Sequence, residues 1–326
     1  MIKEERGPIL LNEMGEQVQL IAVRQDALSI KFIDNPSLKL QLAAVKYDGH
    51  AIQYINNPSL EVQLAAVKQN GRSILFIDNP SEEVQLEAVR EDGLAIQYID
   101  NPSLEVQLVA VKQNGFAIYY IKNPSEEVKL EAVNQDGLAL QFIKNPSLEV
   151  QLEAVRANGH SIEYIDNPVL EVQIEAVKQN GYAIQYINNP SEEVQLEAIK
   201  EDEHSIEYID DPLLEVQLAA VRRYENAIQF IENPSEEVQL EAVRKNGYYI
   251  LYIKNPSSYI KSIVDVIETS HRTIYVLHEP NKEPLFSIGC QKNITKEYFI
   301  ERIYTMDGGL KDNPHRQEYL DILERY

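Results

Sequence analysis

The stretch NPSEEVQLEAVRKNGYYILYIK, residues 233–254, recurs with small changes every 22 residues along most of the chain. An Asn-Pro or Asp-Pro pair starts each copy, at Asn35, Asn57, Asn79, Asn101, Asn123, Asn145, Asn167, Asn189, Asp211, Asn233 and Asn255. A degenerate first copy begins at Glu13 without the proline. Self-similarity at a short fixed period is typical of a solenoid, in which each repeat buries its apolar surface against the next one.

Each copy predicts a helical hairpin, with positions 1 to 22 counted from the Asn. Asn at position 1 and Pro at position 2 fit a helix N-cap and first turn, and Asp/Asn-Gly at positions 14 and 15 fits a helix end with a left-handed glycine. The following x-A-I-x-Y-I segment predicts a second, two-turn helix of α or 3₁₀ type. The predicted fold is therefore an all-α, right-handed α-solenoid of about eleven two-helix repeats over residues 13–256.

Two segments lie outside this pattern. Residues 1–12 predict an N-terminal cap in which Ile9, Leu10 and Leu11 cover the first repeat. Residues 257–326 predict a small α+β domain with a helix in SYIKSIVDVIETS, two strands in TIYVLHEPNKEPLFSIGC and two further helices in ITKEYFIERIYTMDGG and NPHRQEYLDILERY.

The charge of the chain is strongly negative, with 30 basic and 52 acidic residues giving a net charge of −22. The last 70 residues hold 9 basic and 11 acidic residues, a net of −2, so the repeat array carries about −20. Such a surface repels nucleic acid and anionic membranes, which argues against either as a direct partner. Three interpretations stay open: solubility of a long rod, attraction to a basic protein, or imitation of a polyanion.

The sequence also indicates a compartment. Cys290 is the one cysteine, so no intrachain disulfide can form, which suits a reducing environment. The N-terminal region lacks the pattern of a signal peptide, and no apolar run approaches the length of a membrane helix. We therefore expect a soluble, cytoplasmic protein.

Repeated positions predict the core. Ala occupies position 10 in all eleven copies, from Ala22 to Ala242, which indicates close helix contact. Gln at position 7 falls within the apolar arc of the first helix, so we expect a glutamine ladder between layers or to the loop carbonyls. We interpret the aromatic column at position 20 as core packing: Phe32, Tyr54, Phe76, Tyr98, Tyr120, Phe142, Tyr164, Tyr186, Tyr208, Phe230 and Tyr252.

Positions that differ between copies are free of packing and therefore candidates for recognition. Positions 16 and 19, on the second helix, vary most, and that helix lines the concave side of many α-solenoids. Exposed aromatic side chains there would dominate the binding energy of an interface. The candidate partner-binding residues are His50, Arg72, Phe116, Tyr119, His160, Tyr182, His204 and Tyr248.

A second candidate surface is acidic. Glu recurs at position 5 and is joined by Glu at position 9, which can pair with a base at position 12 of the same helix. The position 5 residues form a predicted acidic face: Glu61, Glu83, Glu105, Glu127, Glu149, Glu171, Glu193, Glu215 and Glu237.

Residues with catalytic potential gather only near the C-terminal end: His271, His278, Cys290 and His315. They lack the spacing of a thiol or zinc site, and no CxxC, HExxH, GxSxG or phosphate-loop pattern occurs. We therefore predict no enzyme activity, no catalytic or metal-binding residues and no cofactor. A small thiol or metal enzyme in the C-terminal domain remains the alternative from another class.

The string AVKQNGYAIQYI, residues 176–187, resembles uncharacterised short helical repeats of bacterial and viral proteins, grouped as a domain of unknown function. It is more loosely similar to the variant leucine-rich repeat, which alternates α and 3₁₀ helices. The resemblance covers residues 13–256 and implies architecture without catalytic residues. We expect a non-enzymatic scaffold or inhibitor that binds a protein partner through its second-helix face. The alternative is a phage-type inhibitor that imitates a polyanion and occupies a nucleic-acid-binding enzyme.

Overall fold

The computed structural model describes residues 11–224, 226–270, 272–289, 291–304 and 316–326. The chain divides into two compact units, Met1–Gln179 and Asn180–Tyr326. This division lies inside the repeat array, so the domain boundaries expected after residues 12 and 256 stay predictions. Of the predicted N-terminal cap, Ile9 and Leu10 lie outside the described residues, whereas Leu11 is half-buried.

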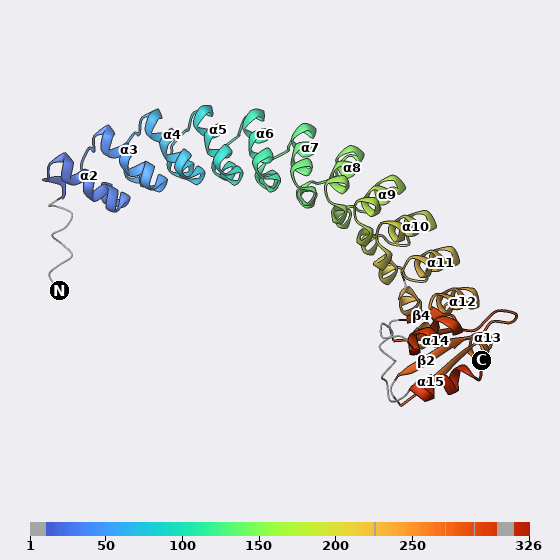
Figure 1. The fold of residues 1–326 in the computed structure, drawn as a ribbon. Coiled ribbons are helices and arrows are strands. Elements are labelled where there is room, and N and C mark those ends of the chain that lie inside the picture. The colour runs from blue at the N-terminus through green and yellow to red at the C-terminus, as the bar shows by residue number, and fades with distance from the viewer. Residues whose placement is uncertain (1–10, 225, 271, 290, 305–315) are drawn as a thin grey trace, which may run out of the picture. The chain divides into compact units, whose positions relative to one another are not determined.

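The first unit confirms the predicted repeat fold. Each described copy has an α-helix over positions 4 to 13 and a 3₁₀ helix over positions 15 to 20. In Figure 1 the α-helices of this unit lie side by side in one row, the α row, and the 3₁₀ helices make a second, the 3₁₀ row. The α row comprises α2 (Glu16–Gln25), α3 (Leu38–Tyr47), α4 (Leu60–Gln69), α5 (Glu82–Glu91), α6 (Leu104–Gln113), α7 (Glu126–Gln135), α8 (Leu148–Ala157) and α9 (Leu170–Gln179). The 3₁₀ row comprises η1 (Ala27–Phe32), η2 (Gly49–Tyr54), η3 (Gly71–Phe76), η4 (Gly93–Tyr98), η5 (Gly115–Tyr120), η6 (Gly137–Phe142) and η7 (Gly159–Tyr164).

The second unit continues the same repeats and ends in a sheet. Its repeat helices are η8 (Gly181–Tyr186), α10 (Glu192–Glu201), η9 (Glu203–Tyr208), α11 (Leu214–Arg223), η10 (Ala227–Phe230), α12 (Glu236–Lys245) and η11 (Gly247–Tyr252). The C-terminal elements are α13 (Ser258–Ile263), β1 (Val264–Glu268), β2 (Thr273–Leu277), β3 (Leu285–Ile288), β4 (Gln291–Ile294), α14 (Lys296–Tyr304) and α15 (Arg316–Leu323).

The core runs between neighbouring layers. An α-helix such as α4 packs against its own 3₁₀ helix, the 3₁₀ helix before it and the next α-helix. Positions 6, 10 and 11 point into these contacts, and Val106, Ala110 and Val111 have no exposed surface. Because each layer covers the next, apolar residues on several sides of the α-helix are buried, as solenoid stacking requires.

The α-helix ends just before the Asp/Asn-Gly pair, as predicted, but the caps at both helix ends differ from the predicted ones. The α-helix is capped by Ser at position 3, as where Ser103 Oγ accepts a hydrogen bond from the backbone N–H of Val106 at 3.3 Å. Asn at position 1 is not the cap, and Asn101 instead adopts a left-handed conformation with φ of 51°. Asn tolerates this conformation better than most residues, so it turns the chain before the proline. At the other end, no loop glycine of a described repeat has positive φ.

The loop glycine at position 15 is required by packing instead. A Cβ atom on Gly93 would lie 2.5 Å from the carbonyl oxygen of Ala110 in the next layer. The Gly93 N–H also donates to Gln113 Oε1 of that layer at 2.7 Å. The preceding residue, Asp92, is extended, and its carboxylate accepts from the Leu94 N–H and so caps the 3₁₀ helix.

The glutamines at position 7 bond within their own repeat. Gln107 Nε2 donates to the carbonyl oxygen of Pro102 at 2.9 Å, and most other copies share this bond. The predicted ladder between layers is therefore wrong for these donors, which bond to the carbonyl at position 2 of their own repeat. Gln239 does bridge layers, since its Oε1 accepts from the Ser257 N–H at 2.9 Å.

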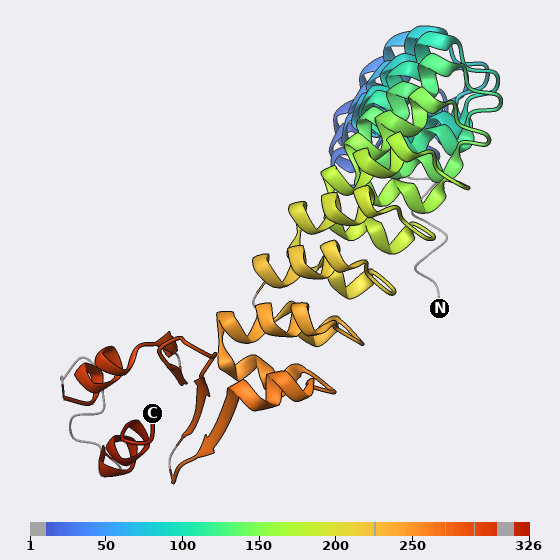
Figure 2. The same ribbon diagram turned by 90° about the vertical axis from the view of Figure 1, so that its right-hand side faces the viewer.

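The C-terminal elements form an antiparallel sheet in the order β1-β2-β3-β4. The predicted helix over SYIKSIVDVIETS is wrong beyond Ile263, because Val264–Glu268 pairs with β2 as strand β1. Strand alternation points Ile274, Val276, Phe286 and Ile288 to one face, where α14 and α15 cover them. The orange and red part of Figure 2 shows the strands between the last repeat and these two helices.

The other face of the sheet covers the last repeat. A Cβ atom on Gly247 would lie 3.1 Å from Tyr275 Cβ of β2, and the Gly247 N–H donates to Asn293 Oδ1 at 3.2 Å. Arg244 of α12 also donates from Nε to both carboxylate oxygens of Glu279, at 3.0 and 3.1 Å. The sheet thus stands where the next repeat would stand.

We predict that Gly93→Ala destabilises the array by about 1 to 3 kcal/mol, because the new methyl group overpacks the Ala110 carbonyl and displaces the bond to Gln113. Urea denaturation followed by circular dichroism measures this change. Gly15→Ala is the control, since no atom lies within 4 Å of its added Cβ. Equal midpoints for Gly93→Ala and the parent chain would contradict the packing role.

We predict that Glu279→Gln lowers the stability of the second unit at pH 7 by about 1 to 3 kcal/mol, because a charge-assisted bond to Arg244 is lost. That hydrogen bond lowers the pKa of Glu279, with Lys282 adding to the effect. A lowered pKa stabilises the fold above the ordinary value of 4.5, and this contribution is lost as pH falls through the folded-state value.

Denaturation between about pH 3 and pH 7 tests this prediction. The parent chain should lose the stabilising contribution of Glu279 on acidification, whereas Glu279→Gln should lack that component. Glu283→Gln, in the same loop but exposed, is the matched control. A pH dependence shared by all three chains would disprove the role of this ion pair.

Candidate functional site

The aromatic column at position 20 lies on the surface of the 3₁₀ row, so its interpretation as core is wrong. Seven of its described side chains are 36% to 44% exposed: Phe32, Tyr54, Tyr120, Phe142, Tyr164, Tyr208 and Phe230. In a 3₁₀ helix residues three apart lie over one another, so positions 15, 18 and 21 form one buried stripe, and position 20 lies over the small buried residue at position 17, such as Ala117. Position 20 falls beside that stripe and borders solvent.

Position 16 supports this column. The Phe116 ring meets the Phe142 ring of the next layer edge-on, with centroids 5.8 Å apart, and His50 meets Phe76 in the same way at 5.6 Å. In the second unit Tyr182 contacts Tyr208 at 5.6 Å. Rings at position 16 therefore pack under the position 20 ring of the next copy, which leaves them half-buried.

The predicted partner-binding residues consequently separate into two groups. Tyr119 is 64% exposed, and Arg72 is also exposed. The side chains at position 16 other than Arg72 are half-buried: His50, Phe116, His160, Tyr182, His204 and Tyr248. Position 16 thus contributes ring edges to a surface, and positions 19 and 20 contribute its most exposed atoms. We call the residues at positions 16, 19 and 20 of the first unit the aromatic band.

Arg72 and His204 are further tied to neighbouring carboxylates. Arg72 Nε donates to Asp92 Oδ2 of the next layer at 2.6 Å, and this bond raises the pKa of Arg72. His204 Nδ1 lies 3.2 Å from Asp202 Oδ1, and its ring centroid is 4.2 Å from that of Tyr224. Both side chains therefore hold local structure and are poorer candidates for partner contact than Tyr119.

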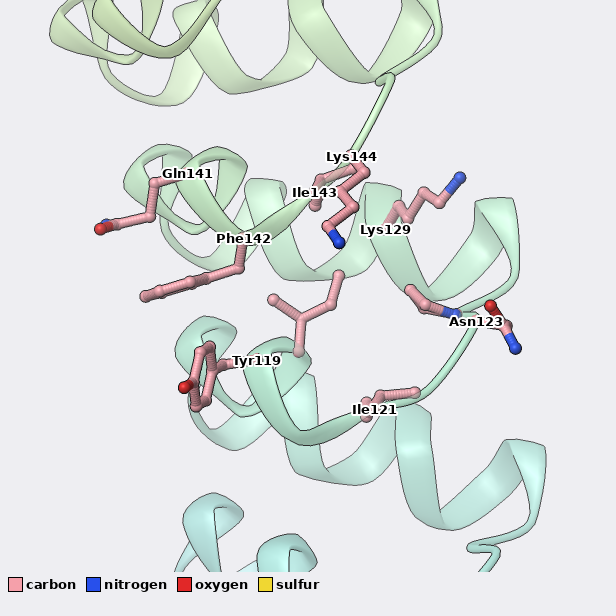
Figure 3. Close-up of a pocket in the computed structure, with 10 residues that line it drawn as sticks. Tyr119, Ile121, Asn123, Lys129, Gln141, Phe142, Ile143 and Lys144 are labelled. Carbon is pink, nitrogen blue, oxygen red and sulfur yellow. The ribbon is translucent and has the colours of Figure 1, made fainter.

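The aromatic band is densest next to a groove of about 840 Å³ between two repeats of the first unit. Tyr119 contacts Tyr120 at 5.0 Å and Phe142 at 5.1 Å between ring centroids. Figure 3 shows Tyr119 and Phe142 at one end of this groove, Lys129 and Asn123 at the other, and Lys144 between them. The groove is lined by Ile118, Tyr119, Ile121, Asn123, Pro124, Lys129, Gln141, Phe142, Ile143 and Lys144.

Lys129, Phe142 and Lys144 were not predicted as site residues. Lys129 is the one residue other than Gln at position 7, and Lys144 stands at position 22, where Asp is commonest. These departures from the repeat were the available signal. Because the glutamines at position 7 recur in the other copies, their pattern predicts a packing role and does not mark the single lysine as a site residue.

The predicted acidic residues lie on α-helices of both units. All nine predicted carboxylates, from Glu61 to Glu237, are exposed, and none has a basic partner within 4.0 Å in the described part of the chain. The position 9 glutamates behave differently. Glu175 Oε2 lies 3.0 Å from Arg156 Nε of the preceding layer, and its Oε1 lies 3.5 Å from Lys178 Nζ. Position 9 thus links layers, while position 5 presents uncompensated negative charge.

The proposed chemistry of the C-terminal domain falls largely outside the described residues, which do not include His271, Cys290 and His315. His278 Nε2 lies 3.1 Å from Asp265 Oδ2, and the Tyr326 hydroxyl donates to the same carboxylate oxygen. Burial, followed by this bond, raises the pKa of Tyr326 to about 12, which keeps the phenol neutral. Within the described residues no three His, Cys, Asp or Glu side chains are grouped to hold a metal ion.

Comparisons with protein-family models, with curated proteins and with solved structures find no match to this chain. The resemblance to short helical repeats of unknown function therefore stays a prediction. None of the helices in the described ranges has the length and apolar character needed to cross a membrane.

Proposed function

We propose that this protein is a non-enzymatic scaffold that binds a protein partner along the aromatic band. The observation that supports this proposal is the column of aromatic side chains at position 20 of the 3₁₀ helices, seven of which are 36% to 44% exposed. Exposed apolar side chains are normal when scattered, whereas a contiguous row is typical of an interaction surface. Large aromatic rings with few rotatable bonds are also the side chains that contribute most to protein interfaces.

The band is held in place before a partner arrives. Phe116 supports Phe142 from below, and Tyr119 contacts both Tyr120 and Phe142, so these rings lose little conformational freedom on binding. Since ordering of side chains opposes association, a preformed surface favours affinity. The segment from Phe116 to Phe142 is therefore the proposed centre of the interface.

We predict that Tyr119→Ala/Tyr120→Ala/Phe142→Ala reduces partner recovery at least tenfold when the full chain is the bait for affinity purification, because the exposed rings supply the contact area. Quantitative mass spectrometry of the captured proteins measures this loss. Leu38→Ala/Leu60→Ala/Leu104→Ala is the matched control, since these exposed leucines lie on the α row. Recovery that is unchanged in the aromatic variant, or reduced as much in the control, would refute this function.

A second candidate function is supported by the exposed position 5 carboxylates, which recur once per layer without ion pairs. A basic groove that binds nucleic acid would be attracted to such a row, so the protein would act as an inhibitor that imitates a polyanion. The two candidates use opposite rows of helices and are separable by mutation.

If the acidic face is the contact, Glu61→Gln/Glu83→Gln/Glu105→Gln/Glu127→Gln/Glu149→Gln should weaken partner recovery at least tenfold. Raising NaCl from about 0.05 M to 0.5 M should do the same, because salt screens exposed charges. As the reciprocal control, Tyr119→Ala/Tyr120→Ala/Phe142→Ala should still recover these partners. Binding that survives both the high salt and the glutamine changes would exclude this second function.

A further inference from the structure

The groove beside Tyr119 differs in charge from the rest of the array. Its lining includes Lys129 and Lys144 and no carboxylate. The equivalent groove one repeat later, of about 570 Å³, has Gln151 and Asp166 at these two positions, although Lys144 also borders it. A further cavity on this unit, of about 380 Å³, is lined by Asp136 and Glu153 against a single Arg156. The groove beside Tyr119 is thus a local cationic site on a strongly acidic protein.

The two lysines differ in the charge that they leave available for a ligand. Lys129 Nζ lies 3.2 Å from Glu126 Oε2. The Ser147 hydroxyl also donates to the Glu126 carboxylate, which therefore has two partners. Lys144 is exposed, with no carboxylate within 4.0 Å in the part of the chain that the structure describes. Lys129 therefore neutralises Glu126, and Lys144 leaves the groove with an uncompensated positive charge.

The acidic array does not cancel this site. At physiological ionic strength exposed charges are screened over about 8 Å, which is close to the roughly 8 to 10 Å between packed helices. A bound group therefore senses mainly the residues of its own groove and the adjacent layer. Among the lining residues the uncompensated charge is that of Lys144, because Lys129 is paired with Glu126.

We propose that this groove binds an acidic peptide segment of the protein partner, with an apolar side chain placed against Tyr119 and Phe142. The inference rests on the proposed function and adds the chemistry of the partner. The geometry supports it because the aromatic rings and the lysines occupy opposite ends of one groove (Figure 3). Asn123 adds an amide group that can pair with a peptide backbone.

The repeat itself supplies a variant that should fold. Lys129→Gln restores the residue found at position 7 of the other copies, with the Pro124 carbonyl as its acceptor, as Gln107 has Pro102. Lys144→Asp restores the commonest residue of position 22. The double variant therefore removes the cationic site while it makes the sequence more regular. Lys39→Glu/Lys46→Gln, two layers or more away, changes the net charge equally and is the matched control.

The experiment pans a random 12-residue peptide display library against the full chain and measures the enriched peptides, made synthetically with a fluorescent label, by fluorescence polarisation. We expect enriched peptides to combine Asp or Glu with an aromatic or aliphatic residue. We expect Lys129→Gln/Lys144→Asp to weaken their binding at least tenfold and Lys39→Glu/Lys46→Gln to leave it within twofold.

Three outcomes would overturn the inference: no enriched peptide, enriched peptides without acidic residues, or equal binding to the lysine variant. Labelled dT12 is titrated in parallel, and tighter binding of that oligonucleotide through the same lysines would reassign the groove to phosphate groups. Peptides that lose binding on Tyr119→Ala but not in the lysine variant would leave the proposed function standing while removing this inference.

Discussion

The stacking of the repeats depends on one close approach, in which the loop glycine of a layer lies against the position 10 alanine of the next. Across Gly49, Gly71, Gly93, Gly115, Gly137 and Gly181, an added Cβ would fall 2.4 to 2.8 Å from that alanine carbonyl. At these copies a Cβ atom at position 15 would overlap that backbone oxygen, whereas Ala27 and Glu203 hold position 15 in two other copies. The same approach sets the distance between neighbouring 3₁₀ helices. A ring at position 16 can therefore meet the position 20 ring of the next layer.

The end of the array obeys the same constraint with different elements. Gly247 has no following repeat, and Tyr275 of strand β2 takes the place of the alanine helix. Asn293 supplies the side-chain oxygen that Gln113 supplies to Gly93. A sheet can do this because alternate strand residues point to opposite faces, one toward η11 and one toward α14 and α15. The α+β elements therefore end the stack by making the same kinds of contact with η11 that a following repeat would make.

The period of the sequence was sufficient to predict the solenoid, since 22-residue spacing and the Gly and Pro positions leave little choice of element. It was insufficient where one residue type serves two purposes. Asn before Pro fits both an N-cap and a left-handed turn, and only the chain path shows that Ser103 is the cap while Asn101 turns. The aromatic column was misplaced because regular recurrence fits a partly exposed row as well as a buried one, and seven of its rings border solvent. The strand after Ile263 was missed since its partners lie further along the chain.

Some positions of the repeat are needed for stacking and others are not, and binding residues can arise at the second kind without loss of the fold. Val106 and Ala110 recur because the stack needs them. Where Lys replaces Gln at position 7, as at Lys129, one hydrogen bond to a proline carbonyl is lost and the layers stay in place. Such an exchange changes the local charge over a distance similar to one layer, so a single copy can acquire a binding property that its neighbours lack. Regular repeats therefore make exceptions the most informative residues: in this array the exceptions Tyr119, Lys129 and Lys144 converge on one groove.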